Sequence, residues 1–502
     1  MRGRLKNILL LLLAAVLLAG VSQIQRSLNR DRDQLGLTRS APLDNAPPVL
    51  AFTTVALGGF RGLISNMLWI RATELQDQDK FFETVQLADW ITKLEPHFVQ
   101  VWLVQAWNMA YNISVKFKDA PDRWRWVQRG IELLRDDGLR YNPNETLIYR
   151  ELAWFFQHKM GANLDDAHLY YKQQWAEAMV KVFGEGKPNF DELINPQTDD
   201  ARQRFLLLTN KYKMDPKFIK EVDGRYGPLE WRLPETHAVY WAAKGLEKAA
   251  QNPAKVNKDE LITLRRVIYQ SMQLAVVRGR LIFDPFAKTV DLSPNLDIVA
   301  KANAAYEQAM EEDEKNRDHI SRAHKNLVAN IVYFLYEHNR EADAAQWYRY
   351  LAGKYPDKPL WDGDRYPDSL PTKLSLEDYV FARVQEDIGE TSPDRIRLAI
   401  EGFLIRSYRN LAIDQEDRAA GAKLLARKVW ATYQSKMEGI EKRVGLPPFE
   451  QIDREVLNRL LDPQQGAPLE FRAVLRTKLG LPAETAGTPA TTNALPATGE
   501  RR

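Results

Sequence analysis

DKFFETVQLADWITKLEPHFVQVWLVQAWNMAYN, residues 79–112, opens the stretch that decides the fold, and GIELLRDDGLRYNPNETLIYRELAWFFQH, residues 130–158, closes it. Apolar residues recur in it at helical spacing, and this periodicity stops at Pro96 and again at Pro143. A new amphipathic segment begins within a few residues of each proline. Because proline ends a helix and the pattern then resumes, the stretch predicts stacked helical hairpins. We expect an all-α superhelix of antiparallel helix pairs with irregular insertions, preceded by one N-terminal signal-anchor helix.

Composition bounds the possible functions. The chain has 502 residues, 45% of them hydrophobic, so it can bury a large core. Its net charge of +3 is small and charges of both signs alternate, which argues against nucleic acid as a partner. The absence of cysteine excludes disulfides, thiolate catalysis and thiolate zinc sites, and it is compatible with an exported bacterial protein.

Residues 1–26 have the pattern of an export signal. Three basic residues precede an apolar run from Ile8 to Val21, which is long enough for a signal sequence and near the lower limit for a membrane span. The cleavage site is poor, which favours an uncleaved signal anchor over the alternative of a cleaved signal peptide. The anchor implies a single-pass protein of the bacterial inner membrane, with a cytoplasmic N-terminus and the bulk of the chain in the periplasm.

Changes in composition divide the rest of the chain. The apolar segment 49–72 is expected to be a buried first helix of the stack, with an interfacial helix on the membrane as the alternative. The predicted segments are a polar, proline-containing linker (27–48), N-terminal repeats (49–183), a loop-rich insertion (184–235), middle helical repeats (236–356), a second loop-rich insertion (357–374), C-terminal helices (375–481) and a tail with a disordered composition (482–502).

The helical segments resemble tetratricopeptide repeats, in which small and large residues alternate on the inward face and a proline closes the second helix. The match departs from the family where Arg71 and Ala72 replace its Leu-Gly pair, and an insertion lengthens the spacing between the first two closing prolines. The matching inward and closing positions are Phe81, Thr84, Ala88, Ile91 and Pro96, then Trp102, Ala106 and Met109, then Tyr149, Leu152, Ala153 and Phe156, and finally Ala344, Tyr348, Ala352 and Pro356.

Whole phrases, such as LADWITKLEP and GPLEWRLPETHAVYWA, are similar to segments of uncharacterised bacterial envelope proteins with an N-terminal anchor and tetratricopeptide-like repeats. That resemblance implies an architecture and no activity. The chain also lacks the HExxH, GxxxxGK[ST], GxSxG and GxGxxG motifs, and its seven histidines are scattered. We therefore predict no catalytic residue, no cofactor and no metal site.

The chain has an unusually large number of tryptophans, thirteen in all. Trp90 and Trp102 are expected where helix pairs meet. The register set by the prolines predicts a concave, partner-binding groove formed by Trp69, Trp107, Tyr111, Arg150, Trp154 and His158. Burial of these rings by the next repeat or by the 184–234 excursion is the alternative. A second predicted contact patch, or alternatively a packed loop with solvated charges, comprises Lys116, Lys118, Arg123, Trp124, Arg125 and Trp126.

Together these features predict a non-enzymatic, membrane-anchored scaffold or adaptor that binds a protein or peptide partner in an aromatic groove. The alternative is an all-α carbohydrate-active enzyme or glycan-binding protein with an aromatic cleft. For the enzyme, Glu151 with Asp165 or Asp166 is the carboxylate pair to examine. A structural envelope component without a groove is a third possibility.

Overall fold

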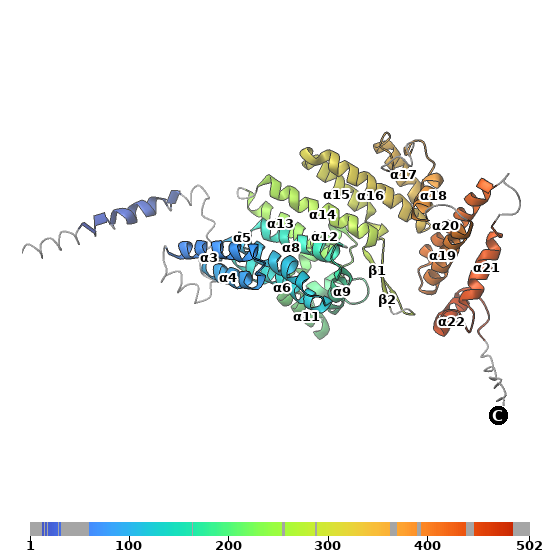
Figure 1. The fold of residues 1–502 in the computed structure, drawn as a ribbon, viewed down its shortest axis with the longest axis horizontal. Coiled ribbons are helices and arrows are strands. Elements are labelled where there is room, and N and C mark those ends of the chain that lie inside the picture. The colour runs from blue at the N-terminus through green and yellow to red at the C-terminus, as the bar shows by residue number, and fades with distance from the viewer. Residues whose placement is uncertain are drawn as a thin grey trace, which may run out of the picture. The chain divides into compact units, whose positions relative to one another are not determined.

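The computed structural model describes residues 13, 14, 16, 17, 19–28, 30, 31, 60–162, 164–253, 257–286, 289–361, 369–388, 393–437 and 446–484. These residues are mostly helical, which confirms the all-α class (Figure 1). None of the helices among them is both long and apolar enough to cross a bilayer. Much of the predicted signal anchor and linker, and the tail from residue 485 onward, lie outside the described residues, so those predictions stay predictions.

The chain divides into two compact units. The first contains residues 1–275 and 300–315, and the second contains residues 276–299 and 316–502. Elements of the first unit, in order, are α3 (Phe60–Asp77), α4 (Phe81–Leu94), α5 (Val99–Trp107), η2 (Asn108–Ile113), η3 (Ser114–Lys116), α6 (Ala120–Glu132), η4 (Leu133–Gly138), α7 (Leu139–Tyr141), α8 (Thr146–Trp154), η5 (Phe155–Gly161), α9 (His168–Phe183), α10 (Phe190–Ile194), α11 (Asp199–Leu206), η6 (Leu207–Lys211), α12 (Pro216–Tyr226) and α13 (Pro234–Gln251). Helix α14 (Lys258–Arg278) begins in this unit, and α15 (Val299–Glu312) returns to it.

Successive helices of the first unit pack as neighbours. Helix α3 packs on α4, α4 on α5, α5 on α6 and α8, and α8 on α13 (Figure 1). The inward positions predicted for α4 form its buried face, and Ile91 is fully buried. Burial of one such side chain contributes about 1.5–3 kcal/mol to stability, so this face holds the helix in the stack.

The segment 184–235, which the sequence predicts to be loop-rich apart from a short helix at 199–213, contains more helix than its Gly, Pro and Asp content suggested. Three helices, α10, α11 and α12, lie within it, and α10 packs on both of the others. Side chains cap all three helices: Asn189 Oδ1 accepts from the Glu192 amide, Thr198 Oγ1 from the Ala201 amide, and Asp215 Oδ1 from the Lys217 amide. The polar residues that indicated loops therefore begin helices.

The second unit contains a strand pair within the segment 236–356, for which the sequence predicts helical repeats. Strands β1 (Arg280–Asp284) and β2 (Thr289–Ser293) form an antiparallel hairpin, with Arg280 opposite Ser293. Its other elements are η8 (Leu296–Ile298), η9 (Glu314–Asn316), which begins before the unit boundary, α16 (Arg317–Glu337), α17 (Glu341–Lys354), α18 (Leu376–Ile388), α19 (Pro393–Ala412), α20 (Glu416–Met437), α21 (Phe449–Leu460) and α22 (Leu469–Lys478). Helices α16 and α17 form one close pair, and α19 and α20 form another.

The same tight turn joins three helix pairs. Asp79, Asn339 and Asp414 have φ angles of 58°, 59° and 60°, so each adopts the left-handed conformation. The next residue donates its amide hydrogen to the carbonyl five residues earlier, as in Lys80 N to Leu75 O at 2.9 Å. Because Asp and Asn tolerate this conformation better than most residues, they end one helix and turn the chain into the next.

Candidate functional site

The helices α5 and α8 each end in a π-helical segment, as α6 and α11 also do, and the ends of α5 and α8 carry four of the six predicted groove residues. Each widens into a π-helical turn, η2 after α5 and η5 after α8, and the two π-helical segments contact each other. Such turns are rare and frequently mark functional sites. Trp107 and Tyr111 run from α5 into η2, and Trp154 and His158 run from α8 into η5, so two neighbouring helices bring the four rings together.

Trp107, Tyr111, Trp154 and His158 form two stacked pairs that meet at a tilted contact between Tyr111 and His158, and we call the four rings the aromatic patch. The Trp107 and Tyr111 rings are 5.0 Å apart and 18° from parallel, and the Trp154 and His158 rings are 4.5 Å apart and 11° from parallel. Tyr111 Oη lies 3.1 Å from His158 Nδ1, which joins the two halves. Within each half the spacing of four residues places both rings on one side of the helix.

The aromatic patch is accessible at one end and anchored at the other. The Trp107 side chain is 41% exposed, whereas Phe155, which packs edge-on against Tyr111, is fully buried. Burial raises the pKa of Tyr111, and the charge of Glu151 adds to this effect. Burial, together with the charge of Lys159, lowers the pKa of His158. At neutral pH the patch therefore presents uncharged rings.

A cluster of buried charged side chains, Lys159, Asp165 and Arg123, packs against the aromatic patch through the contact of Lys159 with the Tyr111 ring. Lys159 Nζ lies 5.0 Å from the centre of the Tyr111 ring and 2.6 Å from Asp165 Oδ2. Arg123 Nη2 lies 3.2 Å from Asp165 Oδ1, which also accepts a hydrogen bond from Tyr171. Burial favours a raised pKa for Asp165, but the hydrogen bonds from Lys159 and the Ala167 amide and the nearby cations outweigh it and hold that pKa below its usual value.

Arg150 and Glu151 lie beside the patch on α8. Arg150 Nη2 donates to Glu151 Oε2 over 2.7 Å, and the Arg150 side chain keeps 34% of its exposure. Burial raises the pKa of Glu151, and the charge of Arg150 opposes this rise. Arg150 is thus the accessible cation beside uncharged rings.

The remaining predicted groove residue lies elsewhere. Trp69, on α3, contacts Phe98 with ring centres 5.8 Å apart, and it packs with Leu68 against the core of α4 and α5. Trp102 is buried at a helix junction as expected, with its Nε1 donating to Pro96 O over 2.9 Å. Trp90, expected at another junction, is instead 46% exposed.

The second predicted patch is mostly engaged in packing. Lys116 Nζ lies 5.3 Å from the centre of the Phe81 ring, Trp124 stacks on Tyr171, and Trp126 stacks on Phe117. Arg125 is paired with Asp122 at 3.2 Å, Arg123 belongs to the charge cluster under the aromatic patch, and Lys118 is exposed. The packing agrees with the alternative interpretation, but Arg123 to Trp126 lie on helix α6 and not in a loop.

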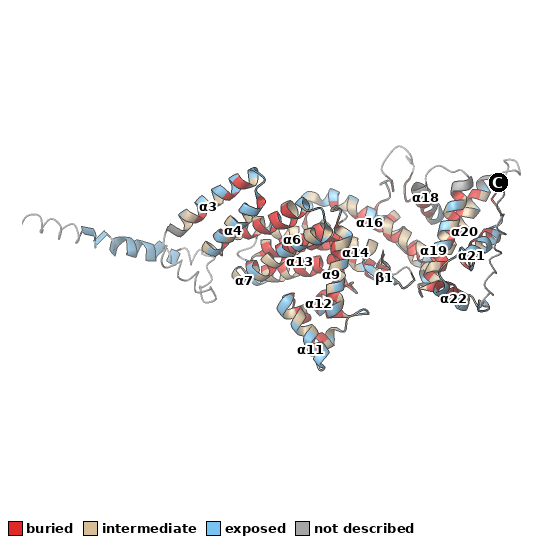
Figure 2. Ribbon diagram, turned by 60° about the horizontal axis from the view of Figure 1, so that its bottom comes forward, coloured by how far each residue is buried: buried red, intermediate tan, exposed pale blue. Residues whose placement is uncertain are grey.

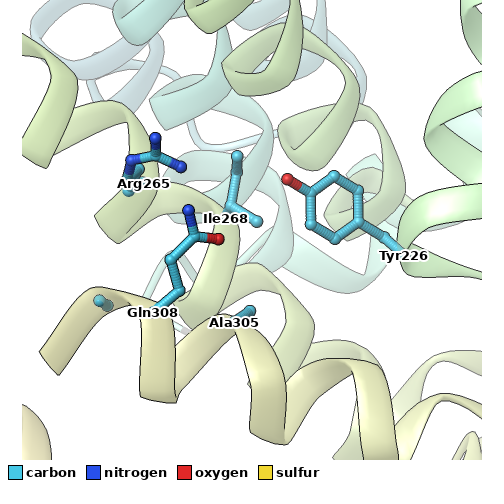
Figure 3. A pocket seen from close by; sticks show the side chains of 6 residues that line it. Tyr226, Arg265, Ile268, Ala305 and Gln308 are labelled. Atoms are coloured by element: carbon cyan, nitrogen blue, oxygen red, sulfur yellow. The ribbon is translucent and has the colours of Figure 1, made fainter. Parts of the chain in front are cut away.

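A cavity between α12, α14 and α15 is too small to be a substrate site. Tyr226, Arg265, Ile268 and Gln308 surround it (Figure 3), and its volume is about 10 Å³, room for one water at most. Among the described residues, no group of three or more His, Asp or Glu side chains is placed to hold a metal ion.

The sequence could not reveal the π-helical turns or the charge cluster of Arg123, Lys159 and Asp165. These residues lie on three separate segments, and only the fold brings them together. The chain matches no protein-family model, and comparisons with curated proteins and with solved structures also give no match. The fold and the site define only a class of protein. It is a mostly helical protein of packed helix pairs with an aromatic patch on its surface.

Proposed function

We propose that this chain is a non-enzymatic, tetratricopeptide-like adaptor of the bacterial envelope, anchored in the inner membrane by its N-terminal segment. The aromatic patch of Trp107, Tyr111, Trp154 and His158 would bind an extended segment of a protein partner. The proposal is supported by the packing of successive helix pairs in the first unit and by the repeated turn between pairs.

A single observation carries the proposal: adjacent helices bring two stacked ring pairs together through the Tyr111–His158 contact, packed against buried Phe155 and exposed at Trp107. Rigid aromatic side chains lose little conformational entropy when they bind, so they often dominate the affinity of an interface. Arg150 beside them can pair with a carboxylate of the partner. We therefore expect a partner segment with apolar or aromatic side chains next to an acidic residue.

The test compares two tryptophans of similar exposure. Trp107→Ala removes the open end of the patch, and Trp90→Ala removes a tryptophan that is 46% exposed on α4. After crosslinking in intact cells and purification of the tagged chain, mass spectrometry should find a partner with the wild type and Trp90→Ala, and about tenfold less with Trp107→Ala. Equal recovery with Trp107→Ala would rule out the patch as the binding site.

A glycan-binding or glycan-cleaving protein is the second candidate, because buried Glu151 has a raised pKa and Asp165 a lowered one, both beside stacked rings. However, Lys159, Arg123, Tyr171 and the Ala167 amide surround the Asp165 carboxylate, and the Asp166 side chain is 98% exposed. Glu151→Gln separates the candidates. Release of sugars from cell-wall glycan by the wild type that this variant abolishes would favour the enzyme, whereas an adaptor releases none.

A further inference from the structure

Helix α3 is apolar on two sides. One side faces the protein: Ala72 and Leu75 are buried, and Leu68 and Trp69 pack against the core of α4 and α5. A helix at the end of a stack needs only one such side, and its other side is ordinarily polar. The second apolar side of α3 therefore needs its own explanation.

That second side consists of Leu63, Met67 and Ile70, which we call the apolar stripe. Their spacings of four and three residues place them on one line along the helix, and they are 52%, 59% and 61% exposed. Figure 2 shows exposed residues in pale blue along α3. An isolated exposed leucine is ordinary, but three large apolar side chains in a row indicate a contact surface.

The sequence leading into α3 indicates what this surface contacts. Residues 49–60, VLAFTTVALGGF, contain no charged side chain and join directly to the helix that carries the stripe. Twelve helical residues would extend about 18 Å, short of the roughly 30 Å hydrocarbon core, so this segment cannot span a bilayer. A protein partner would explain the exposed apolar stripe but not the uncharged segment 49–60 before it. Contact with a lipid surface explains both features.

We propose that the apolar stripe of α3 lies in the surface of a lipid bilayer, as a membrane contact additional to the N-terminal anchor. The proposal rests on the anchor of the proposed function, which keeps this part of the chain close to the membrane. A helix of this kind lies parallel to the bilayer with its apolar side about 5–10 Å deep. The first helix pair would then be held at the membrane surface.

The absence of cysteine allows a direct test in the full chain. Single cysteines are introduced by Met67→Cys and Ile70→Cys on the stripe and by Leu206→Cys on α11, where Leu206 is 51% exposed. Each variant is labelled with bimane and reconstituted in phosphatidylethanolamine–phosphatidylglycerol vesicles. Doxyl-labelled lipid should quench the labels at 67 and 70, and iodide should quench them about fivefold less than the label at 206.

Two results would overturn the proposal. Iodide quenching at 67 and 70 equal to that at 206 would mean that the stripe faces water. Protection of these labels from both quenchers would mean that protein covers the stripe, either residues 49–59 or a second copy. Flotation of the vesicles tests the anchor separately: a chain that floats but fails the quenching test loses only the second contact, and a chain that does not float loses the anchor and the second contact together.

Discussion

At the scale of single residues, two tryptophans with nearly the same exposure have different surroundings. Trp107 stacks on Tyr111 and is thereby joined to His158 and Trp154. Trp90 has no ring partner among the described residues, and its neighbour Asp89 pairs with Lys93. A ring already held in place is a better binding residue than a mobile one, because less entropy is lost on binding. Exposure alone would not have distinguished the two.

His237 provides a prediction about pH. Burial among Phe156, Trp175 and Trp231 lowers the pKa of His237 to about 4, although a hydrogen bond with Trp231 O opposes the shift. In the unfolded chain its pKa is near 6.5. As pH falls below 6.5, the unfolded state binds a proton that the folded state does not bind until about pH 4. Neutral His237 therefore contributes fully to the free energy of unfolding above pH 6.5. Between pH 6.5 and pH 4 the free energy of unfolding falls by about 3 kcal/mol.

The prediction is checked by urea unfolding at pH 7 and pH 4. His237→Gln should lose about 3 kcal/mol less than the wild type between these values, whatever its stability at pH 7. His338, whose pKa burial also lowers to about 4, leaves a residual loss in both proteins. The control is His319→Gln, at an exposed histidine on α16. If His237→Gln and His319→Gln lose the same stability, His237 is not protected from protons in the folded state.

Helical spacing explains which residue predictions succeeded. Trp107 and Tyr111, and likewise Trp154 and His158, are four apart, so their stacking follows from the sequence. Trp90 lies two residues from buried Ala88, about 200° around the helix, so its position favoured exposure. Trp90 was expected to be buried because tryptophan is large and apolar, but its position on the helix, opposite Ala88, decides its exposure. Trp69 was assigned to the groove from the repeat register, which does not specify how α3 packs.

At the scale of elements, the repeated turn matters most. Asp79, Asn339 and Asp414 all adopt φ near +60°, and in each case the following amide caps the preceding helix. The same solution occurs in both units, so it is a property of these helix pairs and not of one location. A residue other than glycine pays an energetic cost for this conformation, and that cost can be measured.

Asp79 is the cleanest position for this measurement, because it is exposed and joins α3 to α4. Asp79→Ala should destabilise the chain by about 1 kcal/mol, since alanine tolerates the left-handed conformation less well than aspartate. Asp79→Gly should remain within a few tenths of a kcal/mol of the wild type or exceed it, because glycine adopts this conformation without strain. Urea unfolding followed by tryptophan fluorescence gives both values.

Gln78→Ala is the control, since Gln78 is an exposed neighbour in the same turn without a positive φ. It should change the unfolding free energy by less than about 0.5 kcal/mol. Equal stability of Asp79→Ala and Asp79→Gly would show that the turn does not depend on the left-handed residue.

The elements that local signals define were predicted, and those that depend on distant pairing were not. Pro96 and Pro143 mark the ends of helical segments, and the helices α4, α5 and α8 lie where this spacing placed them. The β1–β2 hairpin has strands of five residues, too short for a strong alternating pattern, and its turn begins with a proline that also reads as a helix boundary. The π-helical widening of α5 and α8 has no signature in the apolar periodicity of the sequence.

At the scale of the whole molecule, each unit has its own core. The first buries Tyr171 and Trp231 completely, and the second buries Tyr336 and Ile452 to a similar degree. The aromatic patch, its buried charge cluster and α3 with its apolar stripe all belong to the first unit. The first unit, which also includes the residues of the predicted anchor, therefore carries both proposed contacts, one with a partner and one with the membrane.

The orientation of the chain across the membrane can be tested in cells, since a membrane-impermeant maleimide reacts only with introduced cysteines. The basic residues before the apolar run predict a cytoplasmic N-terminus and a periplasmic bulk. In cells with a permeabilised outer membrane, Leu206→Cys should therefore be labelled, and Gly3→Cys only after lysis. Leu208→Cys, at a fully buried position on η6, should react only after denaturation, which shows that labelling reports the folded chain. Protection of Leu206→Cys until lysis would place the units in the cytoplasm and would contradict the envelope location in the proposed function. Labelling of Leu208→Cys before denaturation would show that the chain is not folded, because Leu208 is fully buried in the folded chain.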